Sequence, residues 1–345
     1  MCSPIVPPFR RRYTLRRMMR IIHRRSDGSI DTALGEAEIP RALGDPGSLL
    51  WVDFFEEPDA SCERVMRDCF HFHPLAIDDA LRESHVPKLD DWDSYLYLVL
   101  HAVSFDAAAE DQLATHELDI FAGANYVVTH REHAIEPLER VWGSCGKDQR
   151  VMGRGAARLL YHVVDEVVAS HMPVVDSIDL EMDRIEEQIL SAAAPSALPQ
   201  VLKMKRALLH LRRIVAPQRE TLNRLARDEI AAIGREERIY FRDVYDHLVR
   251  LYDITEGLRD LAAGTLDTYL SVINNRMNEV MKTFTLITTL FMPISFVTGF
   301  FGMNFFTASN PPQAWTSRVV FIAICAATVL VPFLMFAWLR RRRWV

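Results

Sequence analysis

The sequence predicts an α+β membrane protein with an N-terminal α/β domain, long helices after it and two transmembrane helices near the C-terminal end. Three observations support this fold class. Strand-like runs occur only in the first 150 residues, long helical patterns follow them, and two uncharged apolar runs come last. A composition of 49% hydrophobic and 25% charged residues is typical of a folded chain, which argues against general disorder.

Charge is distributed unevenly along the chain. The first 25 residues contain eight arginines and no acidic residue, and a second basic run occupies Arg340–Arg343. The remaining 28 basic residues are outnumbered by 46 acidic ones, so the body of the protein is acidic. This balance favours cations as partners and argues against nucleic acid. Residues 1–17 are expected to form a disordered Arg-rich arm.

Residues 18–150 are predicted to form the α/β domain. Runs rich in β-branched and aromatic residues indicate four strands. These runs are 49–54, 95–103, 117–123 and 125–130. Helical patterns lie between them, for example over 59–70, so a layered arrangement of helices and strands is expected.

Residues 151–282 are predicted to form long helices, because the strand signals stop near residue 156. Helical patterns cover about 157–192 and 199–230, and a third begins near 236. No proline interrupts the third pattern before Pro293. A continuous helix from about 236 to 303 would be on the order of 100 Å long.

The two apolar runs are predicted to be transmembrane helices over 283–301 and 319–339, since roughly 20 apolar residues cross a bilayer. Arg276 and Lys282 precede the first span, and the basic tail 340–345 follows the second. The connecting loop 302–318 carries a single basic residue, at its end. This asymmetry predicts that both termini, and with them the α/β domain, are cytoplasmic and that the loop is external.

No catalytic motif accompanies these elements. We find no nucleophile with a base partner, no phosphate-binding loop and no H-E-x-x-H helix. The five cysteines are scattered, so neither a disulfide framework nor a thiolate metal site is indicated. His71 and His73 form an HFH sequence that is interpreted as structural rather than as a zinc site. The sequence therefore predicts that the protein is not an enzyme.

A mostly polar column of residues repeats every seven positions along the third helix. Its members are Asp246, Asp253, Asp260, Asp267, Asn274, Met281, Thr288, Ser295 and Gly302. Over the membrane half, the four-and-three spacing is filled by Asn278, Thr285, Met292 and Gly299. A strict seven-residue repeat keeps one face toward a common axis only where helices supercoil about each other.

Two interpretations of this column stay open. In one, several copies surround a water-filled pore that the column lines. In the other, the aspartates form a solvated face with pairs such as Asp246 and Arg250, and the Thr and Ser hydroxyls bond to carbonyls of their own helix.

The segment NNRMNEVMKTFTLITTLFMPISFVTGFFGMNF, from Asn274, resembles the first transmembrane helix and Gly-Met-Asn signature of the CorA magnesium transporters. Earlier segments agree in order, beginning at His73 and at Tyr240, and the closing RRRRWV resembles the basic tail of that family. The resemblance covers about residues 18–345. It implies a homopentamer with a funnel of long helices, in the inner (plasma) membrane of a bacterial-type cell, in contact with membrane lipid.

The resemblance also implies functional positions. Gly302, Met303 and Asn304 correspond to the signature, whose asparagine ring meets the incoming hydrated ion. The implied pore-lining residues are Asp267, Asn274, Asn278, Met281, Phe284, Thr288, Met292, Ser295 and Gly299. Phe284 lies off the seven-residue column, so the choice between positions 284 and 285 stays open. Mg²⁺ keeps several of its waters, which suits a neutral amide ring.

A regulatory metal site is implied as well. Asp78 and Asp79 correspond to acids that face Asp243 of a neighbouring subunit, where bound Mg²⁺ holds the pore closed. The alternative is that Asp78 and Asp79 lie near a helix start and that Asp243 pairs with His247.

The sequence departs from the family pattern in the external loop. FFTASNPPQAWTS contains no acidic residue, whereas magnesium-carrying members usually have one shortly after the signature. Relatives in the ZntB zinc-transporting branch also lack that acid, but this chain keeps Gly-Met-Asn intact. Mg²⁺ is therefore the expected transported and regulatory ion, with Co²⁺ and Ni²⁺ as further substrates. The alternatives are a Zn²⁺ transporter of ZntB type and a non-conducting membrane sensor of divalent cations.

Overall fold

The computed structural model describes residues 18–82, 86–146, 149–192, 196–302 and 318–342. It divides into two compact units, residues 1–266 and residues 267–345. The predicted arm over 1–17 and nearly all of the predicted external loop lie outside the described residues.

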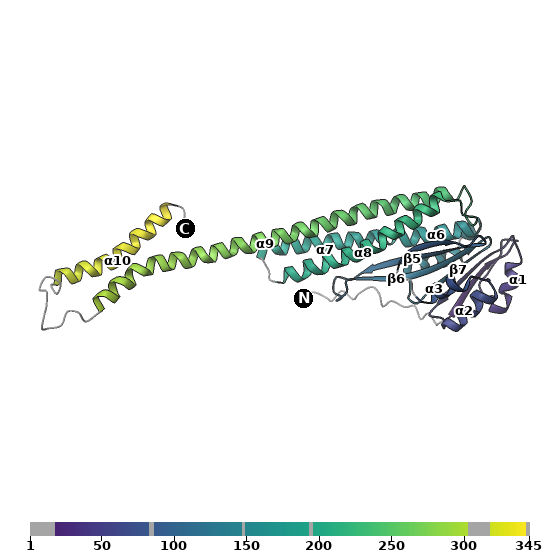
Figure 1. Cartoon of the computed structure of the whole chain (residues 1–345), viewed down its shortest axis with the longest axis horizontal. Helices are drawn as coiled ribbons and strands as arrows, with labels where there is room; N and C mark the ends of the chain where they lie inside the picture. Colours follow the sequence, from purple (N-terminus) through teal and green to yellow (C-terminus); the bar gives the residue numbers. More distant parts are fainter. Residues whose placement is uncertain (1–17, 83–85, 147–148, 193–195, 303–317, 343–345) are drawn as a thin grey trace. The chain divides into compact units, whose positions relative to one another are not determined.

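The first unit contains a seven-stranded mixed sheet (Figure 1). Its strands are β1 (Met18–Arg24), β2 (Ile30–Asp31), β3 (Leu49–Phe55), β4 (Lys88–Asp91), β5 (Tyr95–Phe105), β6 (Leu113–Gly123) and β7 (Tyr126–Arg131). Their order in space is β2-β1-β3-β7-β6-β5-β4. Strands β3 and β7 are parallel, and the other neighbouring pairs whose register is described are antiparallel.

All four predicted strands are confirmed, as β3, β5, β6 and β7. The short strands β2 and β4 and the strand β1 were not predicted. In β1 the arginines hide the strand pattern, although Ile21 and Ile22 are both buried. Arg20 can occupy this position because its guanidinium is bonded to the carboxylates of Asp53 and Glu139.

Helices cover both faces of the sheet, as expected for an α/β layered domain. On one face lie α1 (Ile39–Leu43), α2 (Asp59–Asp68) and α3 (Pro74–Leu81), whose apolar residues form one core with alternate strand residues. Phe72 stacks on Phe121 in this core, with ring centroids 4.2 Å apart. The opposite face carries Trp51, which contacts Trp142 of α4 (Glu136–Cys145).

A buried charge network lies between the parallel strands and their neighbours. The Asp53 carboxylate is fully buried and accepts hydrogen bonds from Thr129 Oγ1 at 2.7 Å and from Arg131 Nη2 at 3.0 Å. Arg20 bonds to the same carboxylate and to Glu139, which also pairs with Arg131. Burial alone would raise the pKa of Asp53, but the charges of Arg131 and Arg20 lower it below its ordinary value.

The remaining helices follow the sheet along the chain. They are α5 (Gln149–Met152), α6 (Ala156–Ala169), α7 (His171–Ala192), α8 (Ala197–Arg227), α9 (Arg238–Gly302) and α10 (Arg318–Arg341), and a short 3-10 helix, η2 (Glu36–Glu38), precedes α1. The predicted helix over 157–192 is divided at Ser170. Pro173 accounts for this break, because it has no N–H to donate to the carbonyl of Ala169. The predicted third helix from about 236 to 303 is confirmed as α9.

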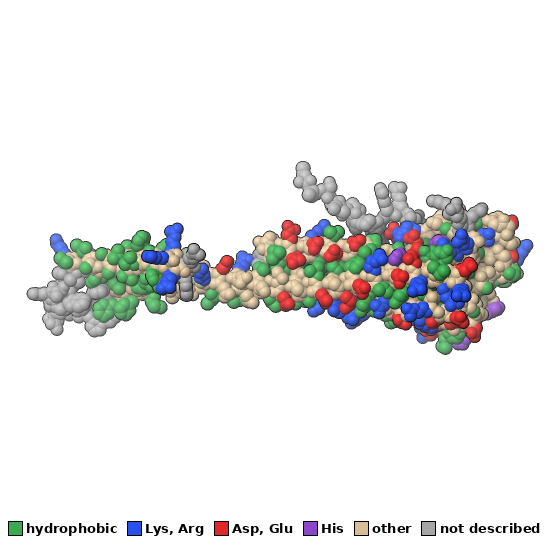
Figure 2. All heavy atoms as spheres, turned by 90° about the horizontal axis from the view of Figure 1, so that it is seen from above, with side chains coloured by type: hydrophobic (Ala, Val, Ile, Leu, Met, Phe, Trp, Pro, Cys, Tyr) green, Lys and Arg blue, Asp and Glu red, His purple; other side chains and the backbone are tan. Residues whose placement is uncertain are grey.

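The apolar windows of α9 and α10 are long enough to cross a membrane, and they are almost entirely unburied. None of the window in α9 and 6% of that in α10 is buried within the chain. A core helix of a soluble protein would be mostly buried, so these exposures favour two membrane spans. Figure 2 shows hydrophobic side chains dominating the visible face around α10, whereas acidic and basic side chains cover the sheet and the helices beside it.

Candidate functional site

Helix α9 has two different faces within the first unit. Its buried positions alternate by three and four residues. They are Phe241, Val244, Leu248, Leu251, Thr255, Leu258, Ala262 and Thr265. Contacts with other helices hold this face, including Tyr161 of α6 against Phe241 and Arg212 of α8 paired with Glu256 at 2.9 Å. The buried face of α9 is therefore fixed on its own chain.

The predicted column lies on the opposite face, about 200° around the helix from the buried residues. Asp246, Asp253 and Asp260 are all exposed in the first unit. Asp260 pairs with Arg259 at 3.0 Å. In the described part of the chain, no ion pair joins Asp246 to Arg250. The ion pair that the solvated-face interpretation expected is therefore not seen.

The predicted pore lining, which consists of the column and Phe284, stays exposed through the second unit. Met281, Phe284 and Met292 are 59%, 63% and 65% exposed, and Ser295 and Gly302 are exposed too. The exposed positions further include Asp267, Asn274, Asn278, Thr288 and Gly299. The single chain thus leaves every described member of the predicted pore lining accessible.

One membrane hydroxyl of the column bonds to its own helix. Thr288 Oγ1 donates to the carbonyl of Phe284 at 2.9 Å, as the second interpretation of the column proposed. This bond uses the hydroxyl proton, but the oxygen keeps lone pairs that can accept a hydrogen bond from water. Backbone bonding and pore lining are therefore compatible at Thr288.

A pocket of about 240 Å³ lies between α9 and α10 in the second unit. Asn278, Met281 and Thr285 line it together with Leu339 of α10. Because Asn278 and Met281 belong to the predicted pore lining, α10 lies beside part of that lining in the single chain. At the open position, Thr285 rather than Phe284 borders the pocket. Met303 and Asn304 lie outside the described residues, and α9 ends at Gly302.

Asp78 and Asp79 lie in the second half of α3, not near its start as the alternative for these acids held. Asp78 Oδ1 is 2.9 Å from Arg82 Nε, and Asp79 Oδ2 is 2.5 Å from Lys88 Nζ. Burial lowers the pKa of Lys88, but its hydrogen bond with Asp79 and the negative charges of Asp79 and Asp90 together more than offset this, so the pKa is raised. Both carboxylates therefore have a basic partner that a bound cation would have to displace.

Asp243 is exposed on α9, near Asp165 of α6 and His247. Burial raises the pKa of Asp165; His247 opposes this shift, whereas the Asp243 charge adds to it. The proposed pair between Asp243 and His247 is not among the ion pairs of the described residues. The sequence did not indicate that Asp165 lies near Asp243, because the two are about 80 residues apart and Asp165 belongs to an ordinary amphipathic helix.

The described residues of one chain contain no group of three or more His, Cys, Asp or Glu side chains that could hold a metal ion. The HFH histidines have other partners. His73 Nδ1 accepts the backbone N–H of Leu75 at the start of α3, and His71 Nδ1 lies 3.2 Å from the carbonyl of Arg67. His73 thus has a structural role at the start of α3. Within the described residues, a metal site that includes Asp78 or Asp79 would need ligands from another chain.

Comparisons with known proteins agree with this arrangement. A family model described as CorA-like Mg²⁺ transporter protein matches residues 46–341. The putative metal ion transporter YfjQ of Bacillus subtilis is 33% identical, over 85% of this chain and 89% of that protein. The cobalt/magnesium transport protein CorA of Thermotoga maritima is 31% identical, over 80% of this chain and 78% of that protein.

The fold is also that of a solved structure in the same group. The complete CorA magnesium transporter of Methanocaldococcus jannaschii aligns with a TM-score of 0.78 and 22% identity, over 94% of this chain and 98% of that one. The family model spans most of the sheet domain, α9 and α10. The chain therefore belongs to the CorA-like Mg²⁺ transporter family of divalent metal ion transporters.

Proposed function

We propose that this chain forms a homopentameric channel that carries Mg²⁺ across a bacterial-type inner membrane, with both termini in the cytoplasm. The observation that carries the proposal is the exposed column on α9, which in the first unit lies opposite the face that is fixed on its own chain. Copies arranged about one axis would bring these columns together, and their long helices would form a funnel ahead of the membrane. Rotational closure is the usual symmetry of such an assembly.

The ion-selecting group in this proposal is a ring of Asn304 side chains, with Gly302 and Met303 completing the signature. Mg²⁺ dehydrates reluctantly, so amide oxygens that accept hydrogen bonds from its waters can select the hydrated ion without stripping it. A ring of carboxylates would hold the ion more firmly and slow its release. The neutral ring therefore combines selection with passage.

Below the ring, the predicted pore lining offers two kinds of surface. Asp267 would concentrate cations, and neutral polar or small residues would line the wet part of the pore. These residues are Asn274, Asn278, Thr288, Ser295 and Gly299. Met281, Phe284 and Met292 would form apolar constrictions that exclude hydrated ions until the helices move apart. Gating would then depend on small movements of α9.

Zn²⁺ is the second candidate ion, because the acid-free external loop resembles that of the ZntB zinc-transporting branch. An external carboxylate raises the local concentration of cations, so its absence weakens electrostatic capture of Mg²⁺. The intact Gly-Met-Asn favours Mg²⁺, with Co²⁺ and Ni²⁺ as further substrates. The two candidates differ in one measurable property, the ion that moves.

Flux into proteoliposomes separates these candidates. We expect Mg²⁺ to enter liposomes that contain the protein at a rate at least about tenfold above protein-free liposomes, because the pore gives the hydrated ion a path that the bilayer lacks. Zn²⁺ should enter more slowly than Mg²⁺ at equal concentration. A flux of Zn²⁺ alone would refute Mg²⁺ transport and identify Zn²⁺ as the transported ion. The absence of flux for both ions would refute transport by this protein.

We further propose that cytoplasmic Mg²⁺ closes the pore by bridging Asp78 and Asp79 of one subunit to Asp243 of the next. Carboxylates brought together repel one another unless a cation lies between them, so such an interface responds to ion concentration. Arg82 and Lys88 already partner the first two acids, and a bound ion would replace part of these contacts. This competition suits a weak site that empties when Mg²⁺ is scarce.

Replacing Asp243 with alanine should therefore make the pore less sensitive to internal Mg²⁺. We expect the internal concentration that halves the flux to rise about tenfold, since one bridging carboxylate is lost. Asp183→Ala, which removes an exposed acid from α7, is the matched control and should leave inhibition unchanged. Unaltered inhibition in Asp243→Ala would count against the sensor.

A further inference from the structure

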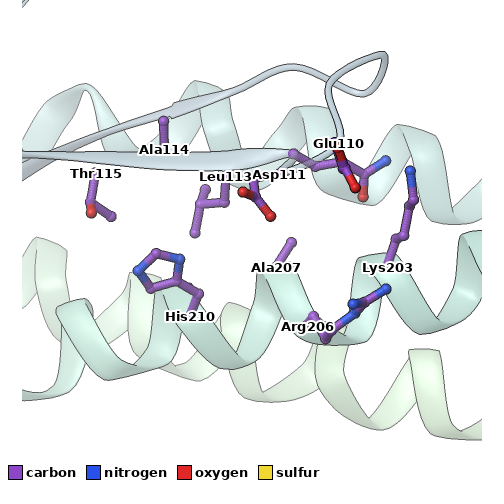
Figure 3. A pocket seen from close by; sticks show the side chains of 10 residues that line it. Glu110, Asp111, Leu113, Ala114, Thr115, Lys203, Arg206, Ala207 and His210 are labelled. Atoms are coloured by element: carbon purple, nitrogen blue, oxygen red, sulfur yellow. The ribbon is translucent and has the colours of Figure 1, made fainter.

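A pocket of about 630 Å³ lies between α8 and the start of β6 in the first unit, apart from the proposed pore and sensor residues. One wall is formed by Lys203, Arg206 and His210 of α8 (Figure 3). The other wall is the turn and strand that carry Glu110 and Asp111. Its volume is in the range of pockets that hold small molecules.

Helix periodicity explains why the three basic side chains share one wall. Positions 203, 206 and 210 lie on one face of α8, because residues three or four apart are neighbours on a helix. In the described part of the chain none of these three side chains forms an ion pair, although Arg206 Nε lies 3.4 Å from the carbonyl of Leu202. By contrast, Arg212 on the same helix is paired with Glu256 at 2.9 Å. The pocket therefore keeps three basic groups available on one side.

The opposite wall carries hydrogen-bond acceptors that, among the residues that the structure describes, form no ion pair with these basic side chains. Glu110 and Asp111 form no ion pair across the pocket in the described residues, and Gln112 and Thr115 add neutral polar groups. In Figure 3, Lys203 extends toward Glu110, and His210 lies below Thr115. A molecule that fills the space would meet basic groups on one side and hydrogen-bond acceptors on the other.

We propose that this pocket binds a phosphorylated polyol, with the phosphate against Lys203, Arg206 and His210 and the hydroxyl groups against Glu110 and Asp111. Lysine and arginine bind phosphate oxygens through charge-assisted hydrogen bonds, and carboxylates accept hydrogen bonds from hydroxyl groups. The described lining contains no phenylalanine, tyrosine or tryptophan, so the wide aromatic platforms on which nucleobases usually stack are missing from it. This composition favours a sugar or glycerol phosphate over a nucleotide.

The same chemistry occurs in two sources. A soluble sugar phosphate is a monoester with two ionisable oxygens, whereas the headgroup of phosphatidylglycerol is a diester with one. Glucose 6-phosphate and sn-glycero-3-phosphoglycerol are suitable probes of the two sources. Binding of the first alone assigns the pocket to a soluble metabolite, and comparable binding of the second assigns it to a lipid headgroup.

Calorimetric titration of the full-length protein in phosphatidylcholine nanodiscs tests the proposal with both probes. We expect at least one probe to bind, and the double variant Lys203→Gln/Arg206→Gln to weaken it about tenfold or more, because charge-assisted hydrogen bonds to the phosphate are lost. The matched control is Lys205→Gln/Arg213→Gln, which removes two cations of α8 that do not line the pocket. That control should bind within about twofold of the unmodified protein.

The carboxylate wall has its own test. Asp111→Asn should weaken the binding of glucose 6-phosphate or the glycerol diester and should not weaken the binding of inorganic phosphate, because inorganic phosphate lacks the polyol. Failure of both probes to bind would overturn the proposal. Equal losses in the two double variants would also overturn it, since they would show a general effect of charge rather than a pocket.

Discussion

Replacing Asn304 with alanine should reduce Mg²⁺ flux in proteoliposomes to nearly the level of protein-free liposomes. The substitution removes a ring of amide groups, one from each copy in the proposed pentamer, at the point where hydrated Mg²⁺ would meet the protein. Without these oxygens, the waters of the ion lose their hydrogen-bond partners, and nothing compensates the hydrated ion for leaving bulk solvent. We expect a loss of about tenfold or more in initial rate, measured with an entrapped Mg²⁺ indicator.

A second asparagine of the same loop provides the control. Asn310→Ala changes an identical side chain six positions after the signature and should leave the flux near that of the unmodified protein. If Asn304→Ala transports Mg²⁺ as fast as Asn310→Ala does, the asparagine ring is not the selective element.

Replacing Asp53 with asparagine should lower the stability of the sheet domain by about 3–5 kcal/mol. Asparagine keeps the volume of the side chain and removes its charge, so Arg131, which is 1% exposed, would remain buried beside fewer carboxylates. We expect the thermal unfolding temperature in detergent to fall by roughly 10 °C for a chain of this size. Differential scanning fluorimetry measures this shift.

An exposed ion pair serves as the matched control for this loss. Glu63 pairs with Arg67 one turn away at 2.9 Å, and both side chains are about half exposed. Glu63→Gln should therefore change stability by less than about 1 kcal/mol. A shift in Asp53→Asn no larger than that in Glu63→Gln would refute the view that the buried network stabilises the domain.

The elements with strong periodic patterns were predictable from the sequence. The long apolar runs, the third helix and the strands β3, β5, β6 and β7 all depend on local composition, and the structure contains each of them. β1 was not predicted, because Arg20 is tolerated there only through Asp53 and Glu139, which are distant in the sequence. The break between α6 and α7 depends on the single missing N–H of Pro173, which the apolar periodicity of the region conceals.

The candidate site was predictable in part for the same reason. The column on α9 is a repeat within one helix, so sequence alone could place its members on one face. The partners of Asp78 and Asp79 come from Arg82 and from Lys88 in a different element, and Asp165 reaches Asp243 only through packing of α6 on α9. Contacts of this kind depend on tertiary structure, which no local pattern encodes.

The central claim is that the exposed column of α9 lines the path of the ion. Cysteine placed at Ser295, on the column, and at its neighbour Phe296, off the column, tests it most directly in a Cys325→Ala background that removes the exposed native thiol of α10. A cationic methanethiosulfonate reagent should block Mg²⁺ flux through Ser295→Cys and leave flux through Phe296→Cys largely intact, because successive residues of a helix point about 100° apart. Equal block of both variants, or continued flux through a fully modified Ser295→Cys, would contradict the account.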